Sequence, residues 1–226
     1  MRLTRAARSS ERLAAGAARR ERALARPAEI MAVARDLFAR KGFEATRMDE
    51  IAAAAGVTKP AVYRYFPGKA RLIEAMMQAD LVAPSRAALD WVDRHPGPVQ
   101  DMVRGFAEAV RAMQANGLSR VYLLLAMDEA NRHPEIAGFI RREVLEPGLV
   151  VLARAFERAM ARGELTAGHD PQLTARLFFA PFLQASLGAA GYALPLADEA
   201  EADRYRAFHV EAFLRAFGNP EARACP

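Results

Sequence analysis

The chain of 226 residues has one cysteine, Cys225, beside its C-terminus. A single thiol cannot form an internal disulfide or build a cysteine-based metal site. The histidines are also scattered, and none has a cysteine, an aspartate or another histidine three or four residues away; they are His95, His133, His169 and His209. The chain lacks a phosphate-binding glycine loop and a nucleophile elbow as well. We therefore expect no metal, no cofactor, no catalytic residue and no enzymatic activity.

Alternating valines and isoleucines, which are typical of strands, are missing too, and the regular segments have helical spacing. The longest stretch without charge covers residues 177–197, which would be long enough to span a bilayer. However, Pro181, Gln184 and Gly188 interrupt it, and we interpret it as a helix buried in a protein interface. The N-terminus lacks the apolar core of a signal peptide. We therefore expect an all-α cytoplasmic protein without a membrane partner.

Lysine is scarce, since only Lys41, Lys59 and Lys69 stand against 29 arginines. The net charge of +5 is unevenly spread, because residues 1–26 carry +6 and the other 200 residues sum to −1. This N-terminal segment has few large apolar residues, so we expect a basic, flexible arm. Such an arm can lie along DNA phosphates or enter the minor groove, and it can equally be a solvated tail.

Two short helices are predicted between residues 46 and 66. The apolar residues of the first recur on one helical face, at Met48, Ile51, Ala52 and Ala55. Thr46 and Asp49 have the spacing of a capping box before this helix, and Gly56 ends it. Thr58 is placed to cap the second helix. Pro60 lies in the first turn of that helix, where a missing N–H loses no hydrogen bond.

The second helix separates buried from outward side chains. Val62 and Phe66, four residues apart, are expected to point inward. The residues left on the outer side are Lys59, Ala61, Tyr63, Arg64 and Tyr65. The major groove of B-DNA admits one helix, whose donors can then reach base edges. The pair of helices therefore predicts a DNA-binding helix-turn-helix.

Residues 28–75 resemble the DNA-binding domain of TetR/AcrR-type transcriptional repressors. The matching run is Gly42-Phe43, Thr46, Ile51-Ala52, Ala55-Gly56-Val57-Thr58-Lys59, Tyr63-Arg64-Tyr65-Phe66, Lys69 and Leu72. Residues 128–136 resemble AcrR-like regulatory domains less closely. Pro60 departs from the family pattern, which more often has glycine there. The resemblance implies about nine helices, three of them in the DNA-binding domain.

The resemblance also implies roles for individual residues. The candidates for DNA contact are Thr46, Arg47, Thr58, Lys59, Ala61, Tyr63, Arg64, Tyr65 and Lys69. Thr46, Tyr65 and Lys69 would hold phosphates, and helix N-termini at Thr46 and Lys69 would favour this. Lys59, Ala61, Tyr63 and Arg64 would approach base edges or nearby phosphates. The alternative is that Thr46 and Thr58 only cap helices and that Tyr63 only packs against the helix expected at about 27–41.

The remaining segments also have helical patterns, with a first helix at about 27–41. We expect Pro84 and residues 95–98 to interrupt the helices after Gly68, and Pro147 to interrupt a long pattern over 134–162. Further helices are expected at about 118–131, 172–190 and 198–217. The chain is accordingly divided into the arm at 1–26, a DNA-binding domain at 27–78 and a helical domain at 79–220.

The C-terminal domain has apolar residues that could line an effector cavity of the family type. They are Met102, Phe106, Met113, Tyr122, Met127, Phe139, Phe178 and Phe182, joined by Gln184; core packing is the alternative for each. Gln184 could bond across a dimer interface, orient a ligand or face solvent. Ligand pockets usually enclose about 300 Å³ or more. The helices at 172–190 and 198–217 are too apolar to face water and predict a homodimer surface.

Together these patterns predict a homodimeric transcriptional regulator, in the first place a repressor. It would occupy a palindromic DNA operator and be released by a small apolar effector. One alternative is a helical carrier of a lipid or drug without DNA-regulated output, which would leave Tyr63, Arg64 and Lys69 without a purpose. Another is an enzyme on a helical scaffold, for which no catalytic constellation is present.

Overall fold

The computed structural model describes residues 26–114, 122, 125, 134–188 and 194–219. Within these residues the regular structure is helical, as the sequence predicted, and it forms eight continuous helices. Most of the helix predicted at 118–131, including Met127, lies outside the described residues. The chain divides into two compact units, Met1–Met76 and Met77–Pro226.

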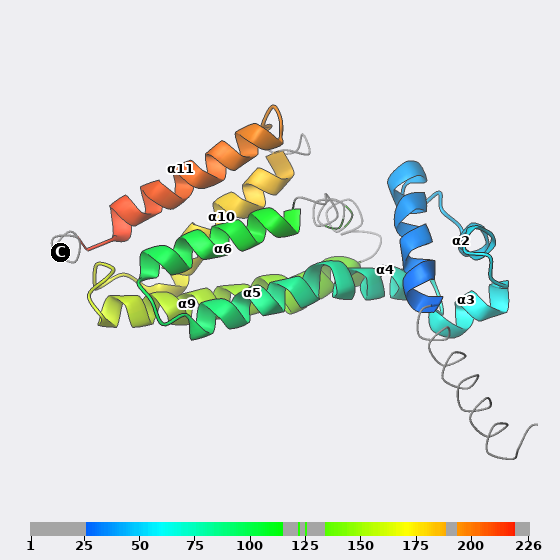
Figure 1. Cartoon of the computed structure of the whole chain (residues 1–226), viewed down its shortest axis with the longest axis horizontal. Coiled ribbons are helices and arrows are strands. Elements are labelled where there is room, and N and C mark those ends of the chain that lie inside the picture. Colours follow the sequence, from blue (N-terminus) through cyan, green and yellow to red (C-terminus); the bar gives the residue numbers. More distant parts are fainter. Residues whose placement is uncertain (1–25, 115–121, 123–124, 126–133, 189–193, 220–226) are drawn as a thin grey trace, which may run out of the picture. The chain divides into compact units, whose positions relative to one another are not determined.

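The first unit contains a helix over residues 26–41, followed by three elements: α2 (Met48–Ala54), α3 (Lys59–Tyr65) and the start of α4 (Lys69–Met77). Figure 1 shows α2 and α3 in cyan after the blue first helix. The helices form because their apolar residues recur on one face, and these residues meet in a common core. Its most deeply buried members are Ile30, Ala34, Ile51, Val62, Leu72 and Ile73.

The start of α2 differs from the prediction by one residue. Arg47, not Thr46, is the N-cap residue, and the Glu50 carboxylate accepts a hydrogen bond from the Arg47 N–H at 3.3 Å. Thr46 is fully buried, and its hydroxyl donates to the Gly42 carbonyl oxygen at 2.8 Å. The predicted capping box at Thr46 and Asp49 is therefore wrong, because the Thr46 hydroxyl is hydrogen-bonded to the turn that follows the first helix.

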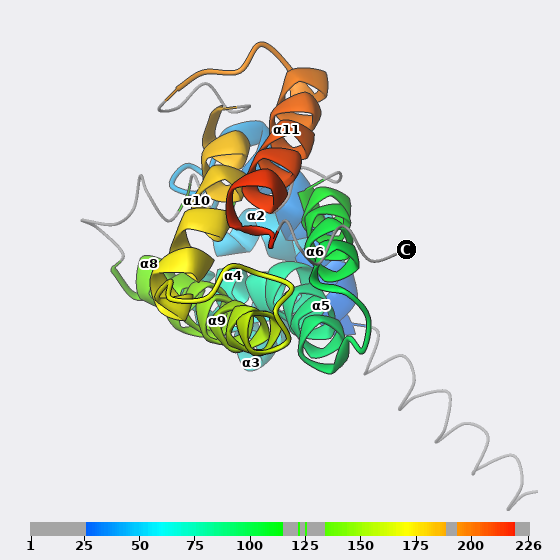
Figure 2. The same ribbon diagram turned by 90° about the vertical axis from the view of Figure 1, so that its left-hand side faces the viewer.

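The second unit is a helical bundle. Its elements are α5 (Ala83–Arg94), α6 (Val99–Gln114), α8 (Pro134–Ile140), α9 (Glu146–Ala161), α10 (Pro171–Gly188) and α11 (Glu199–Phe217). Figure 2 looks roughly along this bundle and shows α5 beside α9, with α10 and α6 above them and α11 outermost. No helix within the described residues is long and apolar enough to cross a membrane.

Aromatic rings fill the centre of the second unit. The Phe178 ring lies against Phe106, Phe156, Phe182 and Phe213, with ring centroids 4.8–5.6 Å apart. Most of these pairs are tilted or edge-to-face, which aromatic quadrupoles favour. The rings come from α6, α9, α10 and α11, so the aromatic cluster ties four helices together.

Two of the predicted helix breaks are absent. Short π-helical segments, η1 (Gln78–Val82) and η2 (Arg141–Leu145), join α4 to α5 and α8 to α9 without ending either helix. Pro84 and Pro147 each follow such a segment and lie in the first turn of α5 and α9. We attribute the continuity to the wider π turn, after which a proline occupies a position where its missing N–H is tolerated. The break predicted at residues 95–98 is confirmed.

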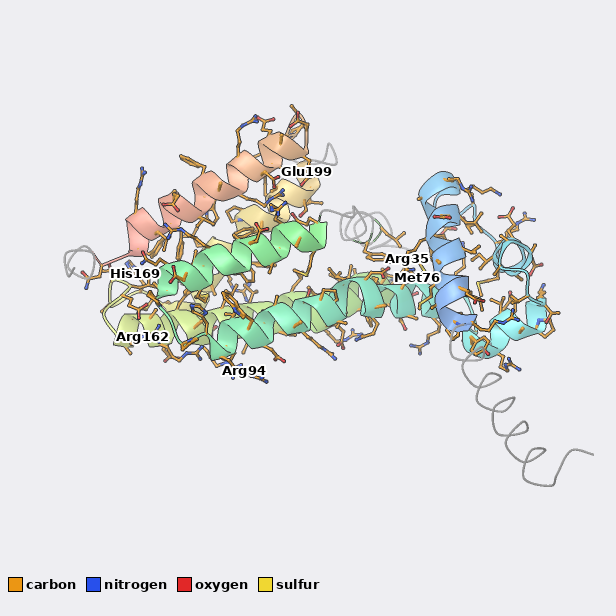
Figure 3. All side chains as sticks on the ribbon, viewed as in Figure 1. Arg35, Met76, Arg94, Arg162, His169 and Glu199 are labelled. Carbon is orange, nitrogen blue, oxygen red and sulfur yellow. The ribbon has the colours of Figure 1, made fainter. Side chains whose placement is uncertain are left out.

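The turn between α9 and α10 lies at one end of the second unit. Figure 3 labels Arg162 and His169 at this end, and Glu199 at the opposite end of α11. Leu165 forms an isolated antiparallel bridge with Gly218, so the turn is joined to the end of α11. The two apolar helices expected at 172–190 and 198–217 are α10 and α11, and they pack against each other.

Candidate DNA-binding surface and ligand pocket

The outer face of α3 carries the side chains that could meet DNA. Val62 and Phe66 are buried in the core of the first unit, as predicted. Lys59, Tyr63 and Arg64 are exposed on the same short helix. The burial of Val62 and Phe66 fixes which face of α3 points outward. That face presents an ammonium, a phenol and a guanidinium to solvent.

Lys59 is paired across the two helices. Its ammonium lies 3.0 Å from the Asp49 carboxylate of α2, and both side chains are well exposed. The hydrogen bond to Asp49, together with its charge, raises the pKa of Lys59. Thr58 occupies the N-cap position of α3, but its side chain makes no capping hydrogen bond. The predicted position of Thr58 is thus confirmed, while the predicted side-chain cap is absent.

Arg64 and Tyr65 form a second pair at the end of α3. The Arg64 Nη2 donates to the Tyr65 hydroxyl at 3.2 Å, and the guanidinium lies 5.0 Å from the centre of the Tyr65 ring. A guanidinium has five N–H donors. The contact with Tyr65 therefore orients Arg64 and still leaves donors for another partner.

Lys69, at the start of α4, holds the turn after the first helix. Its ammonium donates to the carbonyl oxygens of Phe43 at 2.7 Å and Glu44 at 3.1 Å, and it lies 4.5 Å from the centre of the Phe43 ring. An ammonium has three donors, so one remains after these two bonds. Lys69 consequently has a structural role that its sequence position did not indicate.

Lys41, the remaining lysine of the chain, is also used inside the first unit. Its ammonium lies 2.9 Å from Glu50, which in addition caps α2. The hydrogen bond from Lys41, followed by the one from the Arg47 N–H, lowers the pKa of Glu50. All three lysines thus bond to residues of the helix-turn-helix region.

An apolar pocket of about 100 Å³ lies in the second unit between α5, α6, α9 and α10. The residues of its wall that the sequence analysis did not select include Leu81, Leu89, Val110, Ile140, Leu145 and Leu183. Three surface grooves are larger, at about 460, 440 and 230 Å³, but charged side chains line all of them. The apolar pocket has the chemistry of a ligand site, although its volume is below the usual range.

Three polar side chains reach the wall of this pocket: Ser85, Gln114 and Ser186. The Gln114 amide nitrogen donates to the Ser186 hydroxyl, and its oxygen accepts from Arg206 Nη1 at 2.9 Å. Arg206 is only 4% exposed and is ion-paired with Glu199 and Asp203. A buried cation on α11 therefore stands directly behind the polar part of the pocket wall.

Comparison with known proteins places the chain in a family. Residues 30–76 match the family described as bacterial regulatory proteins of the tetR family, and residues 95–205 match the tetracyclin repressor-like C-terminal domain. The DNA-binding transcriptional repressor TetR of Mycobacteroides abscessus is 30% identical over 149 residues, which are 66% of this chain and 75% of the relative. The chain belongs to the TetR family.

Other similar proteins agree with this assignment. The transcriptional activator FasR of Mycolicibacterium smegmatis is 29% identical over 60% of this chain and 63% of its own length. A solved TetR-family regulator from Mesorhizobium loti is 25% identical with a TM-score of 0.64, covering 87% of this chain and 98% of that one. The SmeT–triclosan complex shares the fold with a TM-score of 0.73 at 21% identity, covering 87% and 93%. The chain is therefore a DNA-binding transcriptional regulator.

The TetR-type DNA candidates do not all share one environment. Arg47, Thr58, Lys59, Tyr63 and Arg64 are exposed, while Ala61, Tyr65 and Lys69 are partly buried. Thr46 is 0% exposed, so its side chain cannot reach a phosphate in this conformation. The hydrogen bond to Gly42 gives Thr46 a structural role in place of the expected contact.

The nine residues suggested for a TetR-type effector cavity do not all lie in one site either. Phe106, Met113 and Phe182 line the apolar pocket. Met102 and Phe178 belong to the packed core, and Phe139 is half-buried on α8. The remaining described members bond elsewhere: the Tyr122 hydroxyl donates to Asp80, and the Gln184 amide donates to the Leu194 carbonyl oxygen at 2.9 Å.

The sequence analysis missed the polar part of the pocket and the cation behind it. Ser85 and Gln114 look like ordinary helical residues, and Arg206 is one of many arginines. Their helical spacing relative to Leu81 and Val110 could have placed Ser85 and Gln114 on inward faces. Glu199 and Asp203, the ion-pair partners of Arg206, are close to it in the sequence, as on many exposed helices. The contact of Arg206 with the pocket wall is not visible in the local sequence, because Gln114 lies 92 residues away.

Proposed function

We propose that this TetR-family chain is a homodimeric repressor that binds a palindromic operator and releases it when a small apolar effector occupies the second unit. The observation that carries the proposal is the exposed outer face of α3. Lys59, Tyr63 and Arg64 stand on a helix whose other side is anchored in the core. A major groove admits such a helix, and an arginine can bind guanine through two hydrogen bonds.

The geometry supports different roles for the residues of the proposed DNA surface. Arg64 has free donors and lies at the end of α3, and we assign it to base edges. Lys59, Arg47 and the third donor of Lys69 are assigned to phosphates, with Thr58, Ala61, Tyr63 and Tyr65 completing the surface. Thr46 supports this surface from inside. The relative named as a repressor favours repression, while another relative is named as an activator.

The proposed dimer surface lies on α10 and α11. Leu173 and Leu177 are 64% and 55% exposed on α10, one turn apart, and Phe208 is 73% exposed on α11. Large exposed apolar side chains on adjacent helices mark protein–protein contact surfaces. A second copy of the chain would cover them, and dimers bind two half-sites about a whole number of DNA turns apart.

The proposed effector site is the apolar pocket. SmeT, a protein of the same fold, is known in complex with triclosan. The pocket wall includes Leu81 of η1 and Ser85 of α5, and η1 continues into α4 without a helix break. We infer that an effector changes the position of α4 through this continuous helix. Effector and operator would then oppose each other by roughly 1–3 kcal/mol, reciprocally.

The decisive experiment is an operator selection with the purified chain, followed by binding measurements on the selected site and on random DNA. Arg64→Ala should weaken the selected site by about 1–3 kcal/mol and relax sequence preference. Lys59→Ala should weaken both DNAs alike and make the log–log salt slope shallower by about 0.9. If no sequence is selected above random DNA, the operator proposal is wrong.

The dimer is tested separately. Phe208→Arg should produce monomers in sedimentation and weaken operator binding, because one half-site alone provides too little affinity. Val150→Arg is the matched control, since Val150 is 56% exposed on α9, outside the proposed surface. A Phe208→Arg protein that remains dimeric with normal operator affinity would move the interface elsewhere.

A further inference from the structure

Among the described residues that line the pocket of the second unit, none has an ionisable side chain. The nearest charge behind its polar part is Arg206, which is buried and already bound to Glu199, Asp203 and the Gln114 oxygen. The Arg206 Nε–H has no hydrogen-bond partner within the described residues, but Glu199 and Asp203 already balance its charge. An ionised carboxylate in this pocket would therefore lose its water without meeting an unpaired cation in the described part of the chain, which is strongly unfavourable. The charge arrangement therefore selects against anionic ligands.

Ser85 differs from other buried hydroxyl residues of this unit. Thr174 and Ser186 donate to the carbonyl oxygens four residues earlier, at 2.8 and 3.1 Å, as helical hydroxyls commonly do. Ser85 is 6% exposed, and the acceptor that the described residues offer its hydroxyl is the Met113 sulfur at 3.6 Å. A thioether is a weak acceptor, so a ligand oxygen would be a better one.

Gly148 keeps part of the pocket empty. It is buried in the first turn of α9, which continues η2 without a break, and it lines the pocket. A Cβ built at this position meets nothing within 4 Å, so a larger side chain would extend into free space. A glycine inside a helix is less favourable than an alanine, because it loses more conformational freedom on folding. The chain therefore has an unfilled volume at a position where a side chain would both fit and stabilise the helix.

From these three observations we propose that the pocket binds an uncharged, ring-sized molecule with one carbonyl-type oxygen that accepts a hydrogen bond from Ser85. The volume of about 100 Å³ is somewhat smaller than the roughly 150 Å³ of a dry apolar cavity that admits benzene. A single ring with a small substituent exceeds this volume, so its binding requires the pocket to expand. A regulatory role for this ligand rests on the proposed effector function. The binding of the ligand to the pocket can be measured without DNA.

Three probes of nearly equal size test the chemical class. Acetophenone carries a neutral ketone oxygen, cumene replaces the ketone by a branched alkyl group, and benzoate carries a charge. Titration calorimetry on the full-length protein should show that acetophenone binds about three- to tenfold more tightly than cumene, as one hydrogen bond would give. Benzoate should bind at least about a hundredfold more weakly.

Two variants locate the binding. Ser85→Ala should remove the advantage of acetophenone and leave cumene unchanged, while Gly148→Leu should abolish the binding of both by filling the pocket. Circular dichroism should show native helix content in each variant, and Ser85→Ala provides the test if Gly148→Leu does not fold. The proposal is overturned if no neutral probe binds, if benzoate binds best, or if Ser85→Ala preserves the difference between acetophenone and cumene.

Operator binding, measured on the same samples, separates this proposal from the proposed function. If acetophenone binds through Ser85 but operator affinity is unchanged, the ligand class stands and the effector role fails. If the protein binds its operator but no neutral probe, the proposal of a DNA-binding regulator is retained and the proposed ligand class is wrong.

Discussion

The longest side-chain contacts of the two units span very different distances along the chain. In the first unit, Lys59 binds Asp49 ten residues away, and Lys69 binds the Phe43 carbonyl 26 residues away. In the second unit, Gln114 binds Arg206 across 92 residues, and Arg104 binds Glu211 across 107. Local contacts leave a legible motif in the sequence, whereas distant ones leave almost none.

This difference explains why one functional surface is easier to identify than the other. Most of the proposed DNA surface lies on one short helix, α3, and the burial of Val62 and Phe66 sets its orientation. The proposed ligand pocket is assembled from four helices, each of which contributes a few inward residues. Variants that act on one unit and spare the other therefore test the comparison directly.

The largest effect is expected in the aromatic core of the second unit. Phe178→Ala should lower the free energy of unfolding by about 3–5 kcal/mol, because it removes a ring that contacts four others. Val150→Ala, on the exposed side of α9, should change it by less than about 0.5 kcal/mol. Urea unfolding followed by the fluorescence of Trp91, the single tryptophan, measures both. A loss below about 1 kcal/mol for Phe178→Ala would contradict the central role of the ring.

A smaller effect is expected at Thr46, where the first unit relies on one buried hydroxyl. Thr46→Val keeps the shape but removes the donor to the Gly42 carbonyl, which should cost about 1–3 kcal/mol. Thr58→Val is the matched control, because Thr58 is exposed and makes no capping hydrogen bond. Thermal unfolding followed by circular dichroism should separate the two. Equal changes of the melting temperature in both variants would mean that the Thr46 hydroxyl does not stabilise the fold.

The ion pair between Asp49 and Lys59 should matter little for stability. Both side chains are exposed, so Asp49→Asn should change the free energy of unfolding by less than about 1 kcal/mol. The same change frees Lys59 and removes a negative charge beside the proposed DNA surface, so operator affinity should rise several-fold. Glu211→Gln, which makes the same charge change on α11, is the control. An unchanged operator affinity of the Asp49→Asn protein would mean that Lys59 does not contact DNA.

The smallest predicted effect is a pH dependence in the second unit. Burial lowers the pKa of His209 below its ordinary value of 6.5, although its hydrogen bond to the Phe178 carbonyl opposes this shift. The unfolded chain therefore binds a proton at His209 more readily than the folded chain. Stability should fall as the pH drops from about 7 through 6.5 towards 5, and His209→Gln should flatten this decline. A decline that keeps its slope in the variant would exclude His209 as the cause.

Much of the first unit was predictable, because helix periodicity and cap residues act within a few positions. The two helices of the motif, the inward Val62 and Phe66 and the outward Lys59 and Arg64 all follow from spacing. The shift of the cap from Thr46 to Arg47 was not predictable, since it depends on the buried contact between Thr46 and Gly42. The assignment of these residues to DNA stays a prediction.

In the second unit, the sequence by itself determined that the segments are helical and which faces are apolar. Only the tertiary structure decided that Pro84 and Pro147 continue helices, that Phe178 packs in the core while Phe106 and Phe182 line a pocket, and that Arg206 is buried. The physical reason is that the hydrophobic effect is non-directional and selects faces without pairing them. Which apolar residues meet, and where a gap remains, depends on how several helices pack at once.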